Sequence, residues 1–126
     1  MMDKDLSKYF DIDERREELR MNIGADIFIE YLAAEPGSDQ PPEVLRCEAV
    51  DVSANGMQVK VPKAFVKGAI HPLIVELYRN DDVFRLTAEV KWVEECGGDY
   101  LMGLALFDSD GTEIIDWKLM LAKQLN

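Results

Sequence analysis

Apolar and polar residues alternate along most of the middle of the chain. Between Asn22 and Tyr31 nearly every second residue is apolar, which is typical of a strand with one buried face. Alternation returns in the runs 73–78 and 84–92, and three further short runs between turn residues are also interpreted as strands. We therefore predict six strands with these approximate bounds: 22–31, 44–53, 57–61, 73–78, 84–92 and 100–107.

Turn residues separate these runs. Asn55-Gly56 lies between the second and third strands, and Gly97-Gly98 lies between the fifth and sixth. Both pairs predict tight hairpins, because Asn and Gly tolerate the positive φ that such turns require. A proline-rich segment over 35–42 removes backbone donors and predicts a surface loop.

Six short strands without helical patterns between them predict a mainly β protein. Closing the sheet into a six-stranded antiparallel β-barrel covers its apolar face and removes exposed strand edges. In the fifth strand the alternation places Trp92 on the same face as Ala88 and Val90. We expect three parts: a charged, flexible N-terminal arm over 1–20, the barrel over 21–108, and a C-terminal α-helix over 109–126 that packs on the barrel.

The end of the chain changes from strand to helix periodicity. Asp110 is a suitable helix cap, and Glu113, three residues later, completes the spacing of a capping box. The apolar residues that follow recur at helical spacing and predict the face that packs on the barrel: Ile114, Trp117, Leu121 and Leu125.

Composition narrows the classes of function. The 126 residues include 14 Lys and Arg against 25 Asp and Glu, for a formal charge of −11. This excess of acid argues against a protein that coats DNA or RNA and against docking on an anionic membrane. No signal peptide begins the sequence, and no apolar run approaches the roughly 18–20 residues of a membrane span. The two cysteines are expected to be free thiols, so we predict a cytoplasmic protein.

Motifs of catalysis and of metal binding are missing. The chain has no phosphate-binding loop, no nucleophile elbow and no zinc-protease motif. His71 is the only histidine, and with Cys47 and Cys96 it does not form a zinc site. The segment from Asp108 resembles the start of a calcium loop, but Leu119 stands where the closing Glu is needed. We expect neither an enzyme nor a cofactor-dependent protein.

Two motifs remain, and they occur in a recognisable order. Arg16 and Arg20 follow an R-R-x-x-x-R pattern, and Asp51, Ser53 and Gly56 follow D-x-S-x-x-G at the end of the second strand. The chain resembles the PilZ domains, bacterial receptors for the second messenger cyclic di-GMP, over roughly residues 14–108. The resemblance extends to the strand count, to V-x-W in the fifth strand and to Met102–Phe107 in the last, which is similar to the family's closing G-x-x-F strand.

The chemistry of these residues fits such a ligand. Arginine takes phosphate or the O6/N7 edge of guanine bidentately, and an ionised Asp51 suits the guanine N1–H and N2–H₂ donors. Alternation places Ser53 on the same face as Asp51, and Gly56 is expected to supply a positive φ. The resemblance implies a ligand site formed by these residues: Arg15, Arg16, Arg20, Asp51, Ser53 and Gly56, with Asn55, Lys60 and Trp92 in lesser roles.

Each of these residues also has an ordinary structural explanation. The arginines can be part of a solvated face, Asn55 a turn residue, and Trp92 a core residue, which the alternation favours as strongly as a ligand contact. The motifs together predict a receptor whose three arginines have little reason to gather on the barrel without ligand. The ligand is expected to bridge them to Asp51, and the receptor in this state is expected to signal to an unidentified protein partner. Two alternatives stay open: an interaction adaptor with the same barrel that binds no nucleotide, and a single-strand nucleic-acid binder, which would need a basic aromatic groove.

Overall fold

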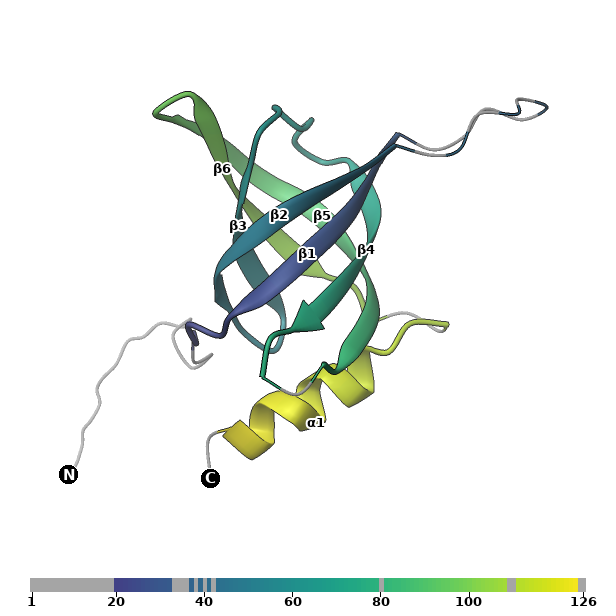
Figure 1. The fold of residues 1–126 in the computed structure, drawn as a ribbon, viewed down its shortest axis with the longest axis vertical. Helices are drawn as coiled ribbons and strands as arrows, with labels where there is room; N and C mark the ends of the chain where they lie inside the picture. The colour runs from purple at the N-terminus through teal and green to yellow at the C-terminus, as the bar shows by residue number, and fades with distance from the viewer. Residues whose placement is uncertain are drawn as a thin grey trace.

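A computed structural model describes residues 20–32, 37, 39, 41, 43–79, 81–108 and 111–124. In this part of the chain the structure contains six strands followed by one helix (Figure 1). Their bounds are β1 Ala25–Leu32, β2 Glu43–Val52, β3 Gly56–Val61, β4 Ile70–Leu77, β5 Val83–Cys96, β6 Asp99–Leu106 and α1 Ile114–Gln124.

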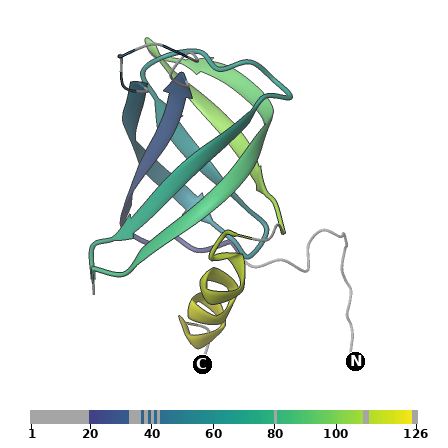
Figure 2. The same ribbon diagram turned by 90° about the vertical axis from the view of Figure 1, so that its right-hand side faces the viewer.

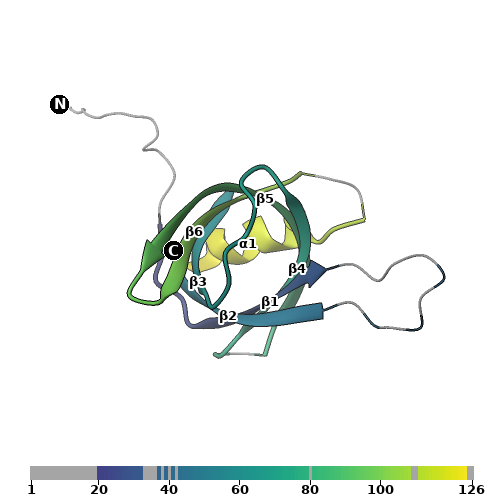
Figure 3. The same cartoon turned by 90° about the horizontal axis from the view of Figure 1, so that it is seen from above.

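The strands form one closed antiparallel barrel in the order β1-β2-β3-β6-β5-β4, and β4 pairs with β1 to complete the ring. Figure 3 looks along the ring and shows α1 beneath its opening. Closure leaves none of the six strands as an edge, which is how a small antiparallel sheet protects its backbone groups. The prediction of a six-stranded antiparallel barrel is confirmed.

Alternate residues of every strand fill the interior. Ile27 of β1, Val59 of β3, Val75 of β4 and Val90 of β5 are 0% exposed, and Ile29 is 1% exposed. Burying one such branched side chain contributes about 1.5–3 kcal/mol, so this packed interior is the main source of the barrel's stability.

The two ends of the barrel differ. Helix α1 lies across one end, which we call the helix end, together with the β2–β3 hairpin and the β4–β5 turn (Figures 1 and 2). The β5–β6 hairpin lies at the opposite, far end. The helix buries Ile114, Trp117, Met120 and Leu121, which confirms three of the predicted apolar positions. Within the described residues, no helix is long and apolar enough to cross a membrane.

The predicted capping box is wrong. Helix α1 begins at Ile114, so Glu113 precedes the helix instead of standing in its third position. The Glu113 carboxylate instead accepts a 2.7 Å hydrogen bond from the backbone N–H of Arg85 on β5. This contact fixes the start of the helix against the barrel. The predicted cap, Asp110, and the fourth apolar position, Leu125, lie outside the described residues.

The predicted positive φ is present in one of the two glycine hairpins and absent from the other. In the β5–β6 hairpin Gly97 and Gly98 have φ values of 58° and 92°, as a tight turn requires. In the β2–β3 hairpin neither Asn55 nor Gly56 has a positive φ, because a wider connection joins Val52 to its register partner Met57. The expected positive φ at Gly56 is therefore wrong.

Trp92 does not lie on the buried face of β5. The register of β5 against β6 shifts between Val90 and Trp92, so Lys91 is an extra residue at that point. Such a bulge reverses the faces of the residues that follow it. Val90 is fully buried while Trp92 is 36% exposed, so the core-packing alternative for Trp92 is wrong.

Candidate ligand-binding site

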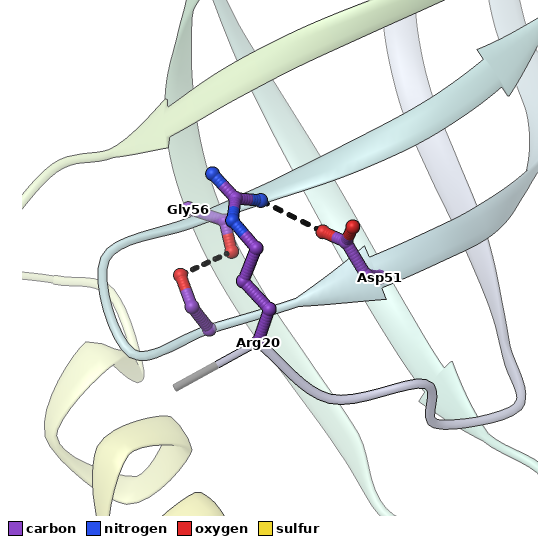
Figure 4. A network of polar contacts seen from close by, with 4 residues as sticks. Arg20, Asp51 and Gly56 are labelled. Atoms are coloured by element: carbon purple, nitrogen blue, oxygen red, sulfur yellow. Dashed lines mark hydrogen bonds and ion pairs between the residues drawn. The ribbon is translucent and has the colours of Figure 1, made fainter. Parts of the chain in front are cut away.

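Arg20 and Asp51 lie in direct contact at the helix end of the barrel. The Arg20 guanidinium donates from Nη1 to Asp51 Oδ1 at 2.8 Å, across 31 residues of sequence (Figure 4). The arginine side chain is 57% exposed and the aspartate 22%. A half-exposed pair of this kind contributes about 0.2–1 kcal/mol, so it positions the two groups without holding them tightly.

The backbone next to Arg20 explains this placement. Met21 and Val52 form an isolated antiparallel bridge, with N–H to O distances of 2.7 and 2.8 Å in the two directions. The bridge fixes the residue after Arg20 beside the residue after Asp51, so the two side chains start from neighbouring backbone positions. We expected the arginines to gather on the barrel only with ligand; Arg20 is already there.

The other two members of the first motif, Arg15 and Arg16, lie outside the described residues. Most of the segment predicted as a flexible arm, residues 1–19, lies outside them as well. Their part in a ligand site stays a prediction.

Ser53 and Gly56 stabilise the β2–β3 hairpin. The Ser53 hydroxyl donates to the Gly56 carbonyl at 3.1 Å, the contact drawn at Gly56 in Figure 4. The Ser53 backbone N–H donates to the same oxygen at 2.8 Å. Ser53 is 1% exposed and follows the last residue of β2, so strand alternation does not place it on the face of Asp51. Its hydroxyl points into the hairpin.

Glycine is required at position 56 because the backbone of β6 comes close to it, and not because the chain adopts a positive φ there. A Cβ at this position would lie 2.6 Å from the backbone oxygen of Leu104 on β6, a separation that real Cβ atoms do not adopt. Asn55, next to it, accepts a 2.8 Å hydrogen bond at its carbonyl from the backbone N–H of Leu106. The motif hairpin is thus packed directly against β6.

A contact that the sequence did not predict joins the hairpin to the helix. The indole Nε1 of Trp117, fully buried in α1, donates to the Ser53 carbonyl at 3.1 Å. The Trp117 ring also packs edge-to-face on Phe84, with centroids 5.5 Å apart. The sequence pattern correctly placed Trp117 on the buried stripe, but helical periodicity does not reveal which backbone group accepts a hydrogen bond.

Lys60 and Trp92 lie further along the outer surface of the barrel. Lys60 on β3 is exposed and approaches Asp99 at 3.8 Å, a distance too long for a strong ion pair. Trp92 covers Gly103 of β6, since a Cβ on Gly103 would lie 2.2 Å from the indole Nε1. Trp92 is therefore a surface residue held in place by a glycine.

A second polar cluster, on β1 and β2, has its partners within the protein. Asp26 accepts from Arg46 Nη2 at 2.9 Å and from the Tyr78 hydroxyl at 2.7 Å. The Arg46 hydrogen bond, followed by the Tyr78 one, lowers the pKa of Asp26, so this carboxylate stays ionised. A groove of about 360 Å³ runs from this cluster to Lys60 and Asp99. Because Asp26 is already bonded on both oxygens, the cluster's first role is to hold β1, β2 and the β4–β5 turn together.

Metal ligands do not gather in the described part of the chain: no group of three or more His, Cys, Asp or Glu there could hold an ion. Burial raises the pKa of the Cys47 thiol to about 12, so it stays protonated, while Cys96 is exposed. The chemistry of the site is that of charge and hydrogen bonding.

The family model described as PilZ domain matches residues 14–119 of the chain. The chain belongs to the PilZ domain family. No curated protein matches it. The matched range contains both motifs, the whole barrel and the first half of α1.

Solved structures share the PilZ fold with this chain. The Bacillus subtilis inhibitor of motility, MotI/DgrA, has a TM-score of 0.65 and 21% identity, over 90% of this chain and 53% of that one. YcgR from Escherichia coli in complex with c-di-GMP has a TM-score of 0.63 and 14% identity, over 88% and 46%. The PilZ domain of the same YcgR, also with c-di-GMP, has a TM-score of 0.59 and 16% identity, over 86% and 91%. The chain spans about half the length of the first two proteins.

Proposed function

We propose that this PilZ domain chain is a non-enzymatic cytoplasmic receptor for cyclic di-GMP. The observation that carries the proposal is the 2.8 Å contact between Arg20 and Asp51, which brings the end of one motif to the start of the other. The family assignment and the solved neighbours that hold c-di-GMP support the same ligand.

Ligand binding is an exchange of partners at this contact. Arg20 donates a single N–H to Asp51, whereas guanine offers two parallel donors, N1–H and N2–H₂, so the base replaces the guanidinium at this carboxylate. On binding, Asp51 accepts from the guanine and Arg20 turns to a phosphate of the ligand, aided by Arg15 and Arg16. The exposed ion pair costs only about 0.2–1 kcal/mol to separate, whereas charge-assisted bonds to phosphate are among the stronger ones.

The remaining motif residues shape the surface that the ligand contacts. Ser53 and Gly56 hold the hairpin against β6, and Asn55 lies at its exposed tip. Lys60 offers a further cation on the same outer face, and the exposed ring of Trp92 offers a flat surface for a base. These last two residues lie further from Asp51 and are expected to contribute less to affinity.

The signal leaves the site through the helix. Ser53 belongs to the motif, and its carbonyl is the acceptor for Trp117 of α1. A ligand that moves the hairpin therefore changes the support of α1, and with it the surface that a protein partner meets. The motility inhibitor among the neighbours makes motility control a reasonable process for such a partner.

Isothermal titration calorimetry with cyclic di-GMP, GTP and a short oligonucleotide tests the proposal. We expect binding of the cyclic dinucleotide alone, and a loss of at least tenfold in affinity in Arg16→Ala and in Arg20→Ala. The matched control is Arg85→Ala, because Arg85 is also more than half exposed and pairs with a carboxylate, Glu113, elsewhere on the barrel.

Three results would contradict the proposal. Absence of cyclic di-GMP binding would leave the adaptor that ignores nucleotides, and binding of the oligonucleotide would favour the nucleic-acid binder. Unchanged affinity in both motif variants, with the Arg85→Ala protein behaving identically, would exclude the arginines from the site.

A further inference from the structure

Four residues lie in one row across the outside of the barrel. The strand registers pair Asp51 with Gln58, Gln58 with Gly103, and Gly103 with Trp92, from β2 through β3 and β6 to β5. Neighbouring strands are about 4.8 Å apart, so the row extends over roughly 14 Å. It joins the two places where the proposed function puts contacts with the ligand.

Gln58 is the one polar side chain inside this row. Its neighbours on β3, Met57 and Val59, are 2% and 0% exposed, so Gln58 points outward. Since the indole of Trp92 already covers Gly103, Gln58 separates that ring from the carboxylate of Asp51. A base lying between Trp92 and Asp51 therefore passes over Gln58.

The amide of Gln58 is available to a ligand. Among the residues that the structure describes, it makes no side-chain hydrogen bond and no ion pair. The residue is half-buried, and its amide nitrogen and oxygen are not among the buried, unpartnered atoms of the described residues, so water reaches them. A ligand therefore replaces hydrogen bonds to water with hydrogen bonds to its own atoms, which favours the base whose donors and acceptors match the amide.

We propose that Gln58 is a specificity residue that donates from its amide nitrogen to O6 of the guanine whose N1–H and N2–H₂ are held by Asp51. This inference rests on the proposed function. On guanine, O6 is next to N1–H and N2–H₂ along one edge, in the order acceptor, donor, donor. Asp51 and Gln58 are direct cross-strand partners, so a carboxylate and an amide face that edge side by side.

Adenine sharpens the argument, because it carries an N6 amino donor where guanine has O6. Gln58→Ala removes the donor to O6, and we expect about tenfold weaker binding of cyclic di-GMP. Gln58→Glu replaces the donor with a second carboxylate beside O6 and Asp51. We expect at least as large a loss for cyclic di-GMP, and a smaller preference for it over cyclic di-AMP.

The experiment is calorimetric titration of wild type, Gln58→Ala, Gln58→Glu and Gln58→Met with both dinucleotides. Gln58→Met keeps the length of the side chain without its hydrogen bonds, so it replaces the alanine variant if thermal unfolding shows that one to be damaged. The control is Thr87→Ala, another half-buried outward side chain, on β5 opposite Pro72.

The outcomes distinguish a failure of the proposed function from a failure of the role proposed for Gln58. Wild type that does not bind cyclic di-GMP overturns the proposed function itself. Wild type that binds, with Gln58 variants that keep both its affinity and its preference for guanine, overturns only the role of Gln58. A loss in the Gln58→Ala or Gln58→Met protein, together with a lowered guanine preference in Gln58→Glu and an unchanged Thr87→Ala protein, supports it.

Discussion

The two glycine hairpins of the barrel use their glycines for different reasons. At the far end, Gly97 and Gly98 have positive φ, and a Cβ on either would meet no atom within 4 Å. At the helix end, Gly56 has no positive φ, but a Cβ there would meet the Leu104 oxygen at 2.6 Å. One hairpin needs glycine to turn, and the other needs it to pack.

The difference follows what surrounds each hairpin. The β5–β6 tip is open to solvent, whereas the β2–β3 connection is held by Trp117 at Ser53 and by Leu106 at Asn55. A hairpin supported on two sides presents Asp51 in a defined position and is in direct contact with α1 through the Ser53 carbonyl. Rigidity of this kind suits a motif that recognises a ligand, and the free tip has no such support.

Removing the support that Trp117 gives to the β2–β3 hairpin should cause the largest loss in the free energy of unfolding. Trp117→Ala deletes a fully buried indole and its hydrogen bond to Ser53, so we expect a loss of about 3–5 kcal/mol in the free energy of unfolding. Urea unfolding followed by fluorescence measures it. Trp92→Ala, on the surface, should lose under about 1 kcal/mol.

The Trp117→Phe variant serves where the alanine variant does not fold. It keeps most of the packing and lacks the donor, so a loss of about 0.5–1.5 kcal/mol is expected. Equal losses in Trp117→Ala and Trp92→Ala would show that the helix does not support the hairpin as described.

Substitution of the glycines tests the comparison directly. Gly56→Ala should cost about 3 kcal/mol, because the new Cβ must push β3 away from the β6 backbone. Gly98→Ala should cost about 1 kcal/mol, because only the turn is strained. Asparagine separates the two reasons: it adopts positive φ readily and should restore part of the loss at 98, while its larger side chain should worsen the loss at 56.

The same urea experiments also show the outcome that would contradict this comparison. If asparagine restores stability at 56, or if both positions respond alike to alanine and asparagine, the two glycines have one function and the comparison fails.

Alkylation of the cysteines perturbs the protein less than the tryptophan and glycine substitutions do. Cys96 ends β5 beside the exposed tip, whereas Cys47 is 4% exposed and its thiol has a pKa raised to about 12. Iodoacetamide at pH 8 should therefore alkylate Cys96 alone in the folded protein, and both thiols in urea. Mass spectrometry counts the adducts; rapid labelling of Cys47 in the folded state would mean that the barrel opens near β2.

Much of the fold could be predicted because alternation is a local signal. The buried residues of β1 and β4 follow from the sequence, as does the turn at Gly97-Gly98. Trp92 could not be placed, because the bulge at Lys91 depends on how β5 pairs with β6. The role of Gly56 also depends on a partner strand, since Leu104 is distant in sequence.

In the candidate site, too, some contacts could be predicted from the sequence and others depend on how the strands pair. The motifs predicted that Arg20 and Asp51 belong together, and the structure places them in contact. The neighbourhood of Gln58 could not be predicted, because it needs the register of three strand pairs at once. The only local signal was a polar residue between two buried ones on β3, which is common on any barrel.

Nuclear magnetic resonance during a cyclic di-GMP titration tests the central claim most directly. In the ¹⁵N-labelled protein we expect the largest backbone amide shifts at Arg20, Asp51 and Gln58, with smaller ones in α1 and none at Gly97 or Gly98. Shifts centred on the far hairpin, or no shifts at saturating ligand, would contradict the claim that the Arg20–Asp51 contact marks the ligand site.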